Sequence, residues 1–175
     1  MASTLDFIKQ IIDHELNLPP GRVWAYNGNQ DIPKDKDLFI ILSFRQKTPY
    51  SNNTKYVRTQ KGLNEVQTTN MSEDILISCI SQNTQARDRA HEVLLALNSF
   101  YSQEIQETNH FHISTTNNIE DNSFIEATSN LNRFDLDCKV LRAYQKVQVV
   151  DYYDKFYWEI WQKGEGEITK TSFNM

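Results

Sequence analysis

Glycine is scarce in this 175-residue chain, and the spacing of its few glycines excludes the common phosphate-binding loops. A P-loop, a dinucleotide-binding fingerprint and a nucleophile elbow each need glycines at fixed short intervals. None of these patterns occurs among the five positions, which are Gly21, Gly28, Gly62, Gly164 and Gly166. The sequence therefore gives no support for phosphate binding by a glycine-rich loop.

Long apolar runs are also missing. Charged and apolar residues alternate from Met1 to Leu18, and no apolar run approaches the roughly 18 residues that span a bilayer. We therefore expect no signal peptide, no membrane anchor and no membrane partner. The net charge of -5 argues against general coating of nucleic acid, because such proteins usually have a strongly basic surface. Any contact with DNA should be local.

The chain has only two cysteines, Cys79 and Cys138, and each lies within an apolar run typical of a strand. Reduced cysteine in such a run behaves as a small apolar residue. We predict two buried thiols rather than a disulfide. Reduced thiols would agree with assembly in a reducing cytoplasm.

Histidines are few, and their spacing is poor for a metal site. His14 and Glu15 begin like a zincin motif, but no second histidine lies four residues after the first. His110 and His112 would share one face of a strand, and His91 could supply a third ligand. Two histidines on a strand are more often ordinary polar surface. We therefore predict no metal site.

Asp135 and Asp137 also share a strand face, as a divalent-cation site would require. Alternating carboxylates opposite an apolar face are nevertheless typical of a solvated strand surface. We therefore predict no catalytic residue and no cofactor. A monomeric cytoplasmic enzyme that uses these aspartates or the histidine pair is the alternative from a different functional class.

Enough apolar side chains are present for a real core, since 39% of residues are hydrophobic and there are nine Phe, eight Tyr and three Trp. A chain of this length forms one domain by default. We predict a single domain over residues 1–161 and a flexible polar arm over 162–175. Ile168 and Phe173 are the apolar residues that could anchor this arm on a partner.

Two segments have helical spacing of their apolar residues. The first covers residues 4–16, begins at a capping box formed by Ser3 and Asp6, and ends before Pro19. The second is predicted over residues 84–105 with one face packed on a sheet. Its apolar stripe consists of Ala86, Ala90, Val93, Leu94, Leu97, Phe100, Tyr101 and Ile105.

Apolar runs at 38–44 and 75–80 indicate strands that are covered on both faces, the first of them central in its sheet. The polar stretch 45–69 between them is too long for a tight turn. We predict a long projecting hairpin or loop there, with strand character at 55–59. Further strands are predicted at 23–26 and 111–115, with a turn at 117–122.

Residues 134–140 alternate between apolar and polar, which predicts a half-buried strand that continues to residue 150. The apolar phase shifts after Val140, and this shift suggests a bulge or a change of partner. Together the segments predict an α+β fold with a mixed, mainly antiparallel sheet and helices packed on one face.

Charge is distributed unevenly along the chain. Five basic residues and no acidic one lie between Leu38 and Asn64, whereas five acidic residues and one basic residue lie between Ile119 and Asp137. Two solvated loops would explain this pattern as well as a function would. The functional hypothesis is a heterologous contact between neighbouring subunits that closes into a ring. Its basic side would be Arg45, Lys47, Lys55, Arg58 and Lys61, and its acidic side Glu120, Asp121, Glu126, Asp135 and Asp137.

The order of these elements resembles that of the tail and neck terminator proteins of tailed bacteriophages. The matching pieces are the strand DILISCI, the helix TQARDRAHEVLLAL and the strand pair around NRFDLDCKVLRAYQKV, and the resemblance covers most of residues 5–161. It implies an α+β structural protein that forms a hexameric ring, caps the completed tail tube and presents a surface to the head or neck. It implies no catalytic residue.

The resemblance also implies partners and a location. The partners would be further copies of the chain, the tail tube protein, and neck, head-completion or sheath proteins, with passing contact to packaged DNA in the lumen. The location would be the virion, after assembly in the host cytoplasm. Another head–tail connector or head-completion adaptor is the alternative within the same structural class.

Overall fold

The computed structural model describes residues 3–25, 35–59, 62–126, 129–150, 158–163 and 168–173. They divide into two compact units, one from Met1–Asn53 and Thr68–Tyr144 and one from Thr54–Gln67 and Gln145–Met175. Whether residues 1–161 fold as one domain stays a prediction. No helix in the described part of the chain is long and apolar enough to cross a membrane.

Helix α1 spans Thr4–Leu16, as the sequence predicts. Ser3 begins it with a capping box, in which the Leu5 amide donates to the Ser3 hydroxyl and the Ser3 amide donates to Asp6 at 2.8 Å. Asn17 ends the helix in the left-handed conformation that a C-terminal cap requires. The side chains that recur at helical spacing are buried, and they are Leu5, Ile8, Ile11, Ile12 and Leu16.

The prediction of one helix over 84–105 is wrong, because the chain forms α2 (Gln85–Leu97) and then α3 (Phe100–Asn109). Ser99 between them is extended, and its hydroxyl accepts from the Ser102 amide at 3.1 Å. The Ser102 hydroxyl in turn donates to the last carbonyl of α2, on Leu97, at 2.7 Å. Serine and asparagine cap helix ends better than they extend helices, which explains the break at Asn98 and Ser99.

The break changes the predicted stripe. Ala90, Val93 and Leu97 are buried as predicted, but Leu94 and Tyr101 are only partly buried. Phe100 is 76% exposed, since it now begins a new helix. Helix α2 packs against α1, and both α2 and α3 contact strand β4.

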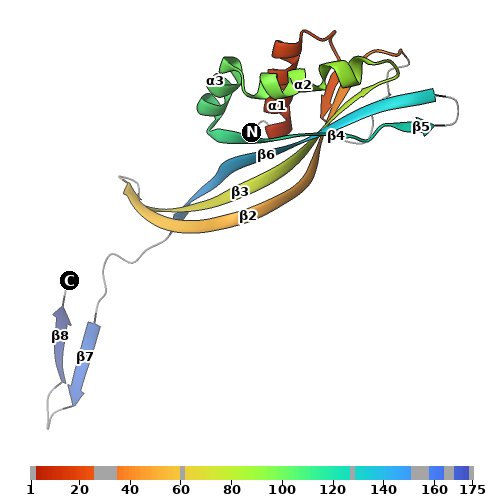
Figure 1. Cartoon of the computed structure of the whole chain (residues 1–175). Helices are drawn as coiled ribbons and strands as arrows, with labels where there is room; N and C mark the ends of the chain where they lie inside the picture. Colours follow the sequence, from red (N-terminus) through yellow and green to blue (C-terminus); the bar gives the residue numbers. More distant parts are fainter. Residues whose placement is uncertain are drawn as a thin grey trace. The chain divides into compact units, whose positions relative to one another are not determined.

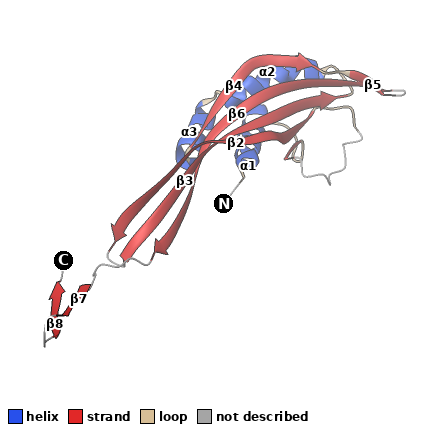
Figure 2. Cartoon of the chain, turned by 90° about the horizontal axis from the view of Figure 1, so that it is seen from below, coloured by secondary structure: helices blue, strands red, loops and turns tan. Residues whose placement is uncertain are grey.

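The main sheet has the strand order β1-β2-β3-β6-β4, with the short β5 paired to β6. The strands are β1 (Val23–Ala25), β2 (Phe39–Thr59), β3 (Gly62–Ser81), β4 (Phe111–Asp121), β5 (Phe124–Glu126) and β6 (Ser129–Val150). The β1–β2 pair is parallel, whereas β4 and β5 each pair antiparallel with β6. The helices lie on one face of this sheet (Figures 1 and 2). The predicted α+β fold class is confirmed.

The core lies between this helix layer and the inner face of the sheet. It includes Ile40 and Leu42 of β2, Ile75 and Ile77 of β3, and Leu136 and Val140 of β6. The cysteines also belong to it, and both are buried free thiols, as predicted. Burial raises the pKa of each thiol to about 12, so both stay protonated.

The predicted alternatives for 45–69 resolve in favour of a hairpin. Strands β2 and β3 are neighbours in the sheet and only two residues separate them, which requires an antiparallel pair. Both strands are far longer than the 3–10 residues usual in globular proteins. Side chains from Arg45 to Thr59 on β2 are exposed, so the hairpin's outer strand has no helix layer over it among the described residues.

Two predictions about β4 and β6 need correction. The predicted turn at 117–122 is strand, because β4 continues to Asp121 and absorbs extra residues in a register shift between Thr115 and Ile119. The Asn122 amide continues this pairing and donates to the Arg133 carbonyl at 2.9 Å. The chain reverses direction only between β5 and β6, because β4 and β5 both pair antiparallel with β6.

The buried phase of β6 does not shift after Val140. Arg142, which is 7% exposed, continues the phase of Cys138 and Val140, whereas Val147 and Val149 are exposed. The shift was predicted wrongly because arginine is usually exposed, so nothing in the sequence indicated that Arg142 lies on the buried face of β6. The pairing with β4 ends at Arg142, but no other described strand takes the place of β4, so the predicted change of partner is not seen.

The C-terminal segment contains a separate antiparallel hairpin of β7 (Trp158–Lys163) and β8 (Ile168–Phe173). Trp158 pairs with Phe173, and Lys163 pairs with Ile168. The side chains of both anchor candidates, Ile168 and Phe173, lie outside the described part. That this segment orders only on a partner stays a prediction.

Candidate subunit interface

The acidic candidates gather where β4 and β6 pair. Glu120 of β4 lies opposite Asp135 of β6, and Asp137 follows on the same strand. Together with Arg45 and Asn118 these three carboxylates line a hollow of about 110 Å³. Arg45 reaches Asp137 with 3.0 Å between the guanidinium nitrogen and a carboxylate oxygen. The structure therefore joins one predicted basic residue and one predicted acidic residue within the same chain.

Asp135 is not a solvated strand residue, because only 5% of it is exposed. Arg133 donates its Nε to both carboxylate oxygens, at 2.9 and 3.1 Å, and Asn122 donates to Oδ2 at 2.9 Å. Burial by itself raises the pKa of Asp135, but hydrogen bonds from Arg133, Ser78 and Asn122 outweigh it and lower the pKa. Asp135 therefore connects β6 to Asn122, which lies between β4 and β5.

A second charged cluster was missed by the sequence analysis and centres on Glu73 of β3, which is fully buried. The Tyr144 hydroxyl donates to Glu73 Oε1 at 2.7 Å, and Lys47 Nζ lies 3.0 Å from the same oxygen. Burial raises the pKa of Glu73, but hydrogen bonds from Thr4, Tyr144 and Lys47 outweigh it, so the pKa is lowered. The sequence does contain one sign of this burial: Glu73 is two residues before Ile75 and four before Ile77, so it lies on the same face of the strand as these two apolar residues.

Arg142 continues this cluster toward α1. Its guanidinium donates to the Thr4 hydroxyl at 3.3 Å and lies 5.4 Å from the ring centre of Phe7 and 5.2 Å from that of Tyr144. Phe7 stacks in turn on Phe111 of β4. The first helical turn of α1 is thus tied to β3, β4 and β6 by polar and aromatic contacts.

The remaining interface candidates lie elsewhere. Lys55 and Arg58 are exposed on β2, and Lys61 lies outside the described residues. Glu120 and Asp121 are exposed on β4, whereas the side chain of Glu126 lies outside the described part. Lys47, also a candidate for the basic side, forms an ion pair with Glu73 of its own chain.

Comparison with protein families gives a match over most of the chain. A family model described as phage neck terminator protein matches residues 3–166. The chain belongs to this family. No curated protein matches the sequence significantly. The resemblance expected from the order of elements is confirmed, and the neck terminator family is structural rather than enzymatic.

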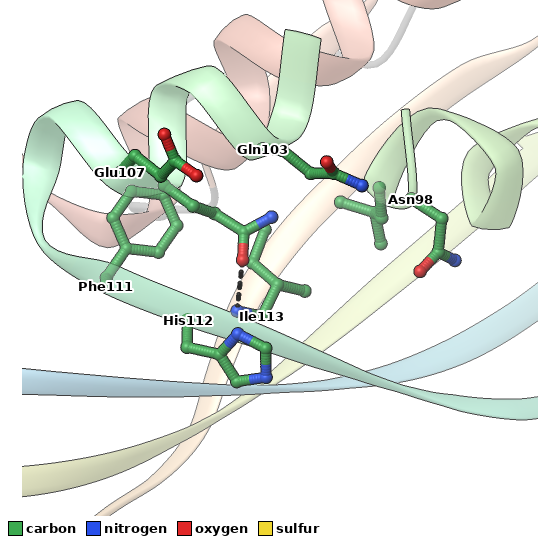
Figure 3. Close-up of a pocket in the computed structure, with 8 residues that line it drawn as sticks. Asn98, Gln103, Glu107, Phe111, His112 and Ile113 are labelled. Carbon is green, nitrogen blue, oxygen red and sulfur yellow. Dashed lines mark hydrogen bonds between the residues drawn. The ribbon is translucent and has the colours of Figure 1, made fainter. Parts of the chain in front are cut away.

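The histidine pair that raised the enzyme alternative lies at the junction of α3 and β4. His110 ends α3 in the left-handed conformation at a φ of 54°, and His112 is exposed on β4. Across the described ranges no three histidine, cysteine or acidic side chains are grouped as a metal site would require. His112 borders an open hollow of about 370 Å³ between α3 and β4, with Gln103, Glu107 and Phe111 (Figure 3).

Proposed function

We propose that six copies of this chain form a ring that ends the tail tube of a tailed phage and joins it to the head or neck. The observation that carries the proposal is the match of residues 3–166 to the neck terminator family. Adding such a ring to the last layer of the tube would stop its growth by covering the growing end. The same ring would present a new surface to neck, head-completion or sheath proteins.

The chain would act without catalysis, cofactor or metal. Its binding partners would be other copies of itself and the tail tube protein, with the lumen of the ring in passing contact with packaged DNA. It would assemble in the host cytoplasm and end in the virion at the junction of tail and neck. The membership in a structural family supports this location and this mode of action.

Opposite charge would contribute to the contact between neighbouring copies. Arg45 and Lys47 are engaged by Asp137 and Glu73 of their own chain, so their loss would disturb the fold as well as any interface. Among the described candidates, exposed Lys55 and Arg58 fit the basic side, and exposed Glu120 and Asp121 fit the acidic side.

Charge reversal tests the contact. Lys55→Glu with Arg58→Glu should impair ring formation, Glu120→Lys with Asp121→Lys should do the same, and a mixture of the two variants should restore it. Ring formation is measured by native mass spectrometry and by incorporation into particles. Arg87→Glu on α2 is a matched control, because Arg87 is exposed and lies on another element. Normal ring formation by both charge-reversed variants would contradict the charge contact. It would not contradict the ring, which imaging tests directly.

A further inference from the structure

Three of the long strands form a ribbon with two open edges. Strand β1 pairs only with Ile40–Leu42 of β2, so the outer edge of β2 from Ser43 to Thr59 has no partner strand in the described part of the chain. Strand β4 begins opposite Arg142 of β6, so the outer edge from Ala143 to Val150 also has none among the described strands. Unpaired edges of this kind are templates for pairing with another strand.

The direction of the Ile113 N–H group on β4 shows which backbone N–H groups of β6 point toward the open edge. The Ile113 amide donates to Gln106 Oε1 of α3 at 2.8 Å and therefore points away from β6 (Figure 3). In an antiparallel pair, its partner Val140 then directs its own N–H and C=O away from β4, toward β3. Because direction alternates along a strand, Ala143, Gln145, Val147 and Val149 direct their amides toward the open edge.

This alternation holds through residue 149 only if β6 contains no bulge. Lys139 of β6 contacts Asp74 of β3, and Gln148 donates to Glu65 at 2.8 Å. The same number of residues separates the two contacts on each strand, which is the spacing expected when neither strand has an extra residue between them.

The edge of β4 and the neighbouring edge of β6 differ in how they are protected from pairing with another strand. The edge of β4 is covered at Ile113 by the Gln106 side chain, which occupies a backbone donor that another strand would need. The β6 edge from Ala143 to Val150 has one charged residue, Lys146, and no proline. Its valines Val147 and Val149 are 59% and 71% exposed, although valine is among the residues best suited to a paired strand.

We propose, resting on the proposed ring, that the β6 edge Ala143–Val150 of one copy pairs with the β2 edge Tyr50–Thr59 of a second copy. The β2 edge offers exposed strand-forming side chains, with Tyr50 at 58% and Tyr56 at 62% exposure. Each copy has both edges, so each donates one and accepts one, and the sheets of neighbouring copies become continuous around the ring. The pairing places Lys55 and Arg58 beside residues 143–150 of the neighbour, whereas Glu120 lies opposite Asp135, so it is an alternative to the charge contact proposed above.

Pairing of unlike edges, β6 with β2, fits the charges of the two edges better than a two-fold pairing of like edges. The exposed part of β2 has four cationic residues and no anionic one, so two β2 edges placed side by side would repel. Pairing two β6 edges would leave both β2 edges open. The partner that fits each edge is therefore the other edge of a second copy of this chain.

Proline and threonine substitutions separate backbone pairing from side-chain contact. Val147→Pro with Val149→Pro removes two outward amides without touching the donors that face β3. Val147→Thr with Val149→Thr keeps both amides and the branched shape but makes the side chains polar. Each tagged variant is supplied in cells that produce phage lacking a functional copy of this chain, and its incorporation into particles is measured beside that of the wild-type chain.

We expect the proline pair to lower incorporation by about ten-fold or more, since two backbone hydrogen bonds are lost at every contact, and the threonine pair to incorporate normally. Normal incorporation of the proline pair, or equal failure of both pairs, would overturn the edge pairing. Absence of the wild-type chain from the tail–neck junction would overturn the proposed function and the pairing with it.

Hydrogen exchange on the wild-type chain gives an answer even if the proline pair folds poorly. Peptides covering 143–150 and 50–59 should exchange more slowly in assembled particles than in the isolated chain, because outward amides gain partners. The peptide around Ile113 is the reference, since its amide is already bonded in the isolated chain. Unchanged exchange in both edge peptides on assembly would refute the pairing.

Discussion

Replacement of Glu73 by glutamine tests the buried charged cluster most sharply. Glutamine keeps the size of the side chain and an acceptor for Tyr144, but it removes the negative charge that Lys47 faces. Hydrogen bonds to charged groups contribute roughly 1.5–3 kcal/mol each. Lys47 has a side chain that is 43% exposed and can regain water, so the loss should stay below the ~3–5 kcal/mol typical of a fully buried broken pair. We expect Glu73→Gln to lower the free energy of unfolding by about 1.5–3 kcal/mol at pH 7.

The pH dependence of this loss identifies its cause. The pKa of Glu73 is lowered in the folded chain, so its ionised form contributes stability that is fully present above the ordinary value of 4.5. That contribution is lost as the pH falls below 4.5 and through the lower pKa of the folded chain. The difference between wild type and Glu73→Gln should therefore narrow in acid.

Urea unfolding at several pH values between neutral and acid measures both effects. Glu104→Gln, on the exposed surface of α3, is the matched control and should change stability little at any pH. A loss below about 0.5 kcal/mol at pH 7, or a loss that does not depend on pH, would refute the ionic role of Glu73.

Three further predictions concern the helices and the C-terminal segment. Ile12→Ala should cost roughly 2–5 kcal/mol in unfolding free energy, whereas Leu94→Ala should cost only about 1, because Leu94 is partly exposed; equal losses would contradict the assigned burial. Ser99→Ala removes the cap of α3 and should cost about 1 kcal/mol in urea unfolding, while no change would show that the cap is idle. Deleting residues 163–175 should leave the melting temperature of the isolated chain nearly unchanged but weaken particle assembly, and a large fall in melting temperature would place the segment in the core.

The elements that the sequence predicts well are those governed by local rules. Helix α1 follows from one capping box and one apolar period, and its bounds are as predicted. The strand at 38–44 follows from an unbroken apolar run, but it is second in the sheet rather than central, and only Ile40–Leu42 pair with the edge strand β1. Both cysteines are buried thiols because each lies in the buried phase of its strand.

The errors arise where polar residues decide the structure. The apolar stripe of the predicted helix continues across Asn98 and Ser99, so periodicity alone could not locate the break between α2 and α3. Glu73 and Arg142 are buried because each finds partners on other elements, and such long-range pairing has no local signal. The charged interface candidates are a prediction from composition, and the structure engages Arg45, Lys47, Asp135 and Asp137 in ion pairs within the chain.

Image reconstruction of an intact phage particle that contains this chain tests the central claim most directly. The account predicts density for six copies in a closed ring at the end of the tail tube that faces the head, with β6 of each copy beside β2 of the next. Density for the chain elsewhere in the particle, or in single copies without a ring, would contradict the proposed function.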